Sequence, residues 1–110
     1  MGIVYTNALQ VRPSATLPSS EFAIHPNDGY DLRLMRIVYT FDIFANCSAD
    51  EFNNATAPSV PGTLFLKNEC RQGTIEMSDG YWERIGKPKL VKLVCSDTRL
   101  LVLNLRSPAG

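Results

Sequence analysis

The chain has a single imidazole, His25, so a catalytic device that needs histidine would have to use this residue. His25 directly precedes Pro26 in a turn-rich segment, and no nucleophile motif surrounds a serine or a cysteine. The seven glycines are scattered singly, and the phosphate-binding pattern G-x-x-x-x-G-K is absent. The sequence therefore predicts a protein that is not an enzyme and has no catalytic residues.

Metal binding is the next chemistry to consider. Cys47, Cys70 and Cys95 are widely spaced, and with His25 they reach the four ligands of a zinc site without the paired spacing that such sites use. The acidic segment "HPNDGYD" offers only three oxygen ligands near one turn, whereas calcium takes six or more. We therefore expect no metal and no cofactor, reduced cysteines of which at least two are buried, and a tight turn over residues 26–30.

The segment "SDGYWERIGKPK" mixes aromatic and basic side chains, as a stacking platform for single-stranded nucleic acid would. A β-strand over residues 81–85 explains the same pattern through packing. The chain has eleven basic and eleven acidic residues, and a net charge of zero makes a nucleic-acid partner a minority interpretation. In that alternative, a small ligand- or single-stranded nucleic-acid-binding β-barrel module, the binding surface is Tyr81, Trp82, Arg84, Lys87 and Lys89.

The elements that would position these residues are mostly strands. Within 110 residues we expect one β-rich domain, with residues 1–30 as a candidate extended arm. The segment 31–45 alternates as one long strand, and its length predicts a bend or bulge within it. The more apolar side should face the core and carries Arg33, Met35, Ile37, Tyr39, Phe41 and Ile43. Ser48 and Glu51 have the spacing of a capping box and predict one short helix, near 48–56.

The second half of the chain has turn residues between short apolar runs. Gly, Asp, Asn or Pro separates the runs 63–67, 73–78, 81–85, 90–95 and 98–105, a pattern typical of an antiparallel meander. The expected fold class is all-β: an antiparallel β-sandwich or small barrel with a C-terminal meander and at most one short helix.

The last strand, "TRLLVLNL", is apolar on both of its sides. A half-buried strand alternates apolar with polar residues, so the second side needs a cover. Either the N-terminal third folds back over it or another subunit covers it, and large apolar patches usually mark a partner. We interpret this strand as a protein–protein interface. We expect no membrane partner. The interface residues would be Leu100, Leu101, Val102, Leu103 and Leu105.

The predicted function follows from these features. The chain lacks an apolar run of about 18 residues that could span a membrane and has no signal-peptide pattern at its start, so we expect an intracellular location. We predict a non-enzymatic structural or assembly subunit that acts through protein–protein contacts, as a homo-oligomer and with other subunits of one assembly. A virus particle is one example of such an assembly.

Overall fold

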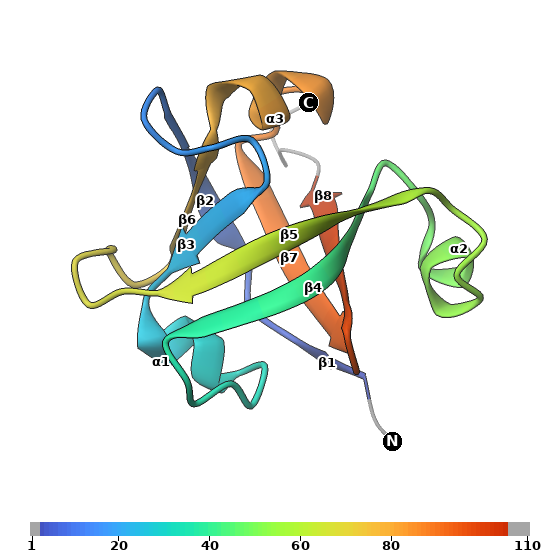
Figure 1. Cartoon of the computed structure of the whole chain (residues 1–110), viewed down its shortest axis with the longest axis horizontal. Coiled ribbons are helices and arrows are strands. Elements are labelled where there is room, and N and C mark those ends of the chain that lie inside the picture. The colour runs from blue at the N-terminus through green and yellow to red at the C-terminus, as the bar shows by residue number, and fades with distance from the viewer. Residues whose placement is uncertain (1–2, 106–110) are drawn as a thin grey trace.

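A computed structural model of the chain describes residues 3–105, which form a closed β-barrel with three short helices (Figure 1). The strands are β1 (Val4–Tyr5), β2 (Leu9–Ser14), β3 (Glu21–Ile24), β4 (Val38–Ala45), β5 (Ser59–Leu66), β6 (Thr74–Ser78), β7 (Leu90–Ser96) and β8 (Arg99–Leu105). The helices are α1 (Pro26–Tyr30), α2 (Ala49–Asn53) and α3 (Asp79–Arg84).

Seven strands close the barrel, in the order β7-β2-β6-β3-β5-β4-β8, and β8 pairs with β7 to complete the ring. β1 pairs with β7 alone. The pairs β2–β6, β3–β5 and β4–β8 are parallel and the remaining pairs are antiparallel. The predicted all-β barrel is confirmed. The strands do not form the alternative sandwich, and the sheet is not wholly antiparallel.

The C-terminal meander is only partly present. β7 and β8 form a hairpin, but β2 lies between β6 and β7, and β3 lies between β5 and β6. β2 and β3, which lie within the candidate arm of residues 1–30, are therefore wall strands of the barrel. Each parallel pair joins strands far apart in the chain, and no turn sequence marks such a pairing.

Three helices form where one was expected. The predicted helix is α2: the Ser48 backbone N–H donates to Glu51 Oε1 (2.9 Å), and the Glu51 N–H donates to Ser48 Oγ (3.1 Å). α1 and α3 replace an expected turn and an expected strand. His25 Nδ1 accepts from the Asn27 N–H (3.0 Å), and Ser78 Oγ accepts from the Tyr81 N–H (3.1 Å). Each Asp-Gly pair thus lies in a capped first helical turn, not in a hairpin.

Apolar side chains from every wall strand fill the barrel, and Phe22, Ile24, Leu64, Ile75, Leu93 and Leu100 are among the fully buried ones. β4 begins only at Val38, so the expected strand over 31–45 is shorter than predicted. Arg33 has a left-handed backbone (φ 59°), which interrupts the extended conformation. Phe41 and Ile43 face the core as expected, but Met35 and Ile37 precede the strand and are exposed.

Candidate functional site

The apolar residues of β8 are covered within the chain. Leu100 and Val102 belong to the barrel core, and Leu101 packs in a second cluster with Phe44 and Phe52. Phe52 comes from α2, and its ring meets Phe44 edge to face with centroids 5.3 Å apart. Leu103 and Leu105 remain partly exposed. On the second side of β8, α2 of the same chain therefore covers Leu101, whereas Leu103 and Leu105 are only partly covered.

The residues of the alternative binding surface do not form a platform. Tyr81 is buried, meets Phe22 edge to face at 5.0 Å, and has its pKa raised by burial to about 12. Trp82 is half-buried and donates from Nε1 to the Pro88 carbonyl oxygen (3.0 Å). Only the basic side chains are open to solvent: Arg84, Lys87 and Lys89.

The groups near α1 also serve the fold. His25 caps the helix, and Asp28 Oδ2 accepts a hydrogen bond from the Gly73 N–H (2.8 Å), which ties α1 to the loop before β6. Asp31 is exposed to solvent.

The most unusual surface lies just after α1. Tyr30, Met35 and Ile37 are large apolar side chains, and their exposed fractions are 69%, 81% and 74%. All three line one hollow of about 270 Å³ together with Pro26, Leu34 and Leu66, and we call this group the α1-end surface. Scattered exposed apolar residues are ordinary on proteins, but a contiguous group around a hollow is typical of an interaction site.

Local contacts hold the α1-end surface in place. Leu32 and Leu34 are buried, whereas Arg33 and Met35 are exposed. The Leu34 N–H donates to the Gly29 carbonyl oxygen (3.0 Å), and the Leu66 N–H donates to the Ile37 carbonyl oxygen (2.9 Å). The exposed side chains are therefore presented by a segment that is anchored at both ends.

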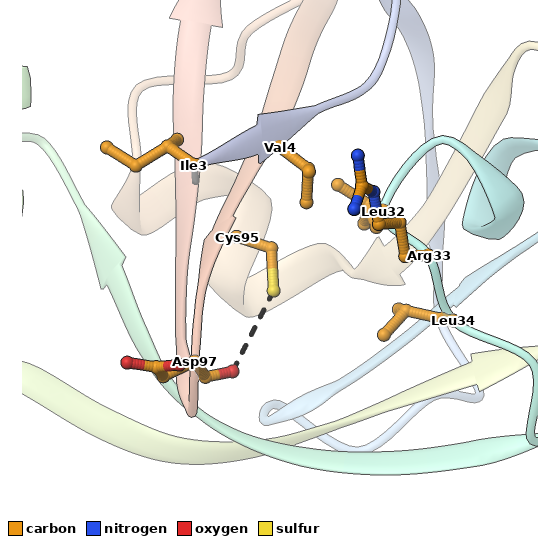
Figure 2. A pocket seen from close by; sticks show the side chains of 7 residues that line it. All are labelled: Ile3, Val4, Leu32, Arg33, Leu34, Cys95 and Asp97. Carbon is orange, nitrogen blue, oxygen red and sulfur yellow. Dashed lines mark hydrogen bonds between the residues drawn. The ribbon is translucent and has the colours of Figure 1, made fainter. Parts of the chain in front are cut away.

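A second hollow adjoins the first at Leu34. It measures about 390 Å³ and lies between β1, the segment after α1 and the turn that joins β7 to β8 (Figure 2). Its lining residues are Ile3, Val4, Leu32, Arg33, Leu34, Cys95 and Asp97. Most of these side chains are apolar, and Arg33 and Asp97 are exposed and carry opposite charges.

Cys95 lines the second hollow, and Figure 2 shows its thiol directed toward Asp97, where it donates to the backbone carbonyl oxygen (3.9 Å). Burial, with a smaller contribution from the Asp97 carboxylate, raises the pKa of the Cys95 thiol. The thiol is therefore protonated near neutral pH and is a poor nucleophile. Cys70 is also buried and Cys47 is half-buried, which confirms that at least two cysteines are buried.

The sequence analysis missed the α1-end surface because "LRLMRIVYT" was interpreted as one strand. The signal that was present is the pair of arginines, Arg33 and Arg36, spaced among apolar residues on both sides of the predicted strand. A long strand with charges on both sides is a reason to expect an interruption.

Within residues 3–105, no group of three or more His, Cys, Asp or Glu side chains is arranged to hold a metal ion. That range also contains no helix with the length and apolar character needed to cross a membrane. Comparison with known proteins gives no match to a family model, a curated protein or a solved structure.

Proposed function

We propose that this protein is a non-enzymatic assembly subunit that works through protein–protein contacts made at the α1-end surface. The single observation that carries the proposal is that Tyr30, Met35 and Ile37 are exposed around one hollow while the segment's own leucines are buried. The proposed contact surface therefore differs from the β8 interface that the sequence suggested.

The energetics favour a partner on this surface. Fully burying a large aliphatic or aromatic side chain stabilises by about 1.5–3 kcal/mol relative to leaving it in water. Hydrogen bonds already anchor the backbone of this segment, so the segment loses little conformational freedom when a partner binds. Three such side chains around a hollow are enough to form the apolar centre of an interface.

The alternative, a module that binds a small ligand or single-stranded nucleic acid, has less support. Its platform needs exposed aromatic rings beside basic residues, and Tyr81 is buried. Trp82 is half-buried, and Lys87 Nζ already lies 5.9 Å from the centre of its ring. An intracellular location and membership of a virus particle stay predictions.

Site-specific photo-crosslinking tests the proposal. A photoreactive phenylalanine analogue replaces Ile37 in the cells that make the protein, and the control places it at Asn53, an exposed residue of α2. We expect a protein adduct from position 37 and none from position 53. No adduct from position 37, or equal adducts from both positions, would contradict the proposal.

A further inference from the structure

We infer that the partner on the α1-end surface is a second copy of this chain, related to the first by a two-fold axis. This inference rests on the proposed function and names the occupant of the same surface. The two-fold arrangement uses one patch on both copies, so the patch must complement itself in shape and in charge.

The shape of the surface meets the first requirement. Met35 and Ile37 are exposed on the segment after α1, and the two hollows share Leu34 of that segment in their linings. The linings of both hollows are largely apolar, and Figure 2 shows the one beside Cys95. A two-fold rotation can place the projecting side chains of each copy in a hollow of the other, which buries apolar surface on both copies at once.

The charges around the surface meet the second requirement. Arg33 and Asp97 line one hollow, Arg36 lines the other, and Asp31 follows Tyr30 directly. All four are exposed, as is Lys67, which follows Leu66 directly, so the rim carries three cations and two anions. A surface for a strongly acidic or basic partner carries charges mainly of one sign, whereas a rim that carries both signs can pair with a copy of itself. The net charge of zero adds no overall repulsion between copies.

Solution mass by light scattering, across protein concentrations, is the first test. We expect twice the chain mass for the unsubstituted protein and the chain mass for a folded Ile37→Asp variant. Loss of a central apolar contact should weaken association about thirtyfold or more. Val60→Asp is the matched control, since Val60 is an exposed apolar residue that lines a different hollow, beside Tyr81 and Ile85. A monomer at every concentration, or equal loss with both variants, would overturn the inference.

A charge-exchange experiment tests the two-fold complementarity without relying on one substitution. One variant carries Arg33→Glu with Arg36→Glu, and the other carries Asp31→Lys with Asp97→Asn. Asn suits position 97 because the backbone there is left-handed (φ 54°). Each variant alone should be monomeric, and an equal mixture should recover the dimer mass. A mixture that stays monomeric, with both variants folded by circular dichroism, would overturn the inference.

The photo-crosslinking experiment separates failure of this inference from failure of the proposed function. An adduct of position 37 with twice the chain mass supports the inference. An adduct with a different protein overturns the inference and leaves the proposed function standing. No adduct overturns the proposed function itself.

Discussion

The Tyr39 hydroxyl accepts hydrogen bonds from the backbone N–H groups of Met35 (2.7 Å) and Arg36 (2.9 Å). Tyr39 is half-buried at the start of β4 and packs against the barrel core. One phenol group therefore joins the core to the segment that presents the most exposed apolar side chain of the α1-end surface. The presentation of Met35 depends on this contact.

Replacement of Tyr39 by Phe removes the acceptor and keeps the ring. We expect faster hydrogen exchange at the Met35 and Arg36 amides and a loss of unfolding free energy of about 0.5–1.5 kcal/mol per hydrogen bond. Tyr30→Phe is the control, because the Tyr30 side chain is exposed and forms no hydrogen bond among the described residues. Unchanged exchange in Tyr39→Phe would show that the segment is held by other contacts.

Arg99 should hold α2 against the second side of β8. Its Nη1 donates to the carbonyl oxygens of Phe52 (3.0 Å) and Asn53 (3.3 Å), and its guanidinium lies 5.6 Å from the centre of the Phe52 ring. We expect Arg99→Ala to lower the unfolding free energy by about 1–3 kcal/mol in urea titrations and to increase binding of an apolar dye. Arg12→Ala, at an exposed position of β2, should change neither quantity.

Gly62 on β5 pairs with Phe41 on β4. A Cβ atom at this position would lie 2.6 Å from Ile43 Cγ1 and 2.9 Å from the Ser20 carbonyl oxygen. We expect Gly62→Ala to destabilise the protein by about 1–3 kcal/mol through overpacking. Gly80→Ala is the control, because no atom lies within 4 Å of a Cβ there and Gly80 is within α3, where Ala is favoured. Equal midpoints for both variants in thermal unfolding would contradict this packing.

The buried phenol of Tyr81 should make stability fall at alkaline pH. Burial raises its pKa from the ordinary value of 10.0 to about 12, so the folded state holds this proton more tightly than the unfolded state. Its contribution is fully present below pH 10 and is lost as the pH rises toward 12. Urea unfolding across this range should show a shallower decline for Tyr81→Phe than for the unsubstituted protein. Parallel declines would mean that other groups dominate.

Local sequence signals predicted the parts of the fold that depend on neighbouring residues. Ser48 and Glu51 predicted α2, and alternation placed Phe41 and Ile43 of β4 on the side that faces the core. The order of strands depends on contacts between distant segments, such as Gln10 with Thr74, which no local pattern records. The barrel was therefore predictable as a class but not as a topology.

The candidate site was harder to predict because exposure was inferred from periodicity. Met35 and Ile37 fall on the apolar side of a strand pattern, yet the strand begins only at Val38. The apolar character of Leu101 was real, but the cover came from Phe52, at a position that local alternation in β8 cannot indicate. Both errors come from tertiary contacts.

The rate of Met35 oxidation in the native protein tests most directly whether a second copy covers the α1-end surface. In a single chain this side chain is 81% exposed, so dilute hydrogen peroxide should convert it to the sulfoxide readily. Mass spectrometry follows the reaction, with the fully buried Met77 as the unreactive internal standard. We predict that the Met35 rate falls as protein concentration rises, and that Ile37→Asp keeps it high throughout. A Met35 rate equal to that of a short peptide of the same sequence at every concentration would contradict the proposed contact.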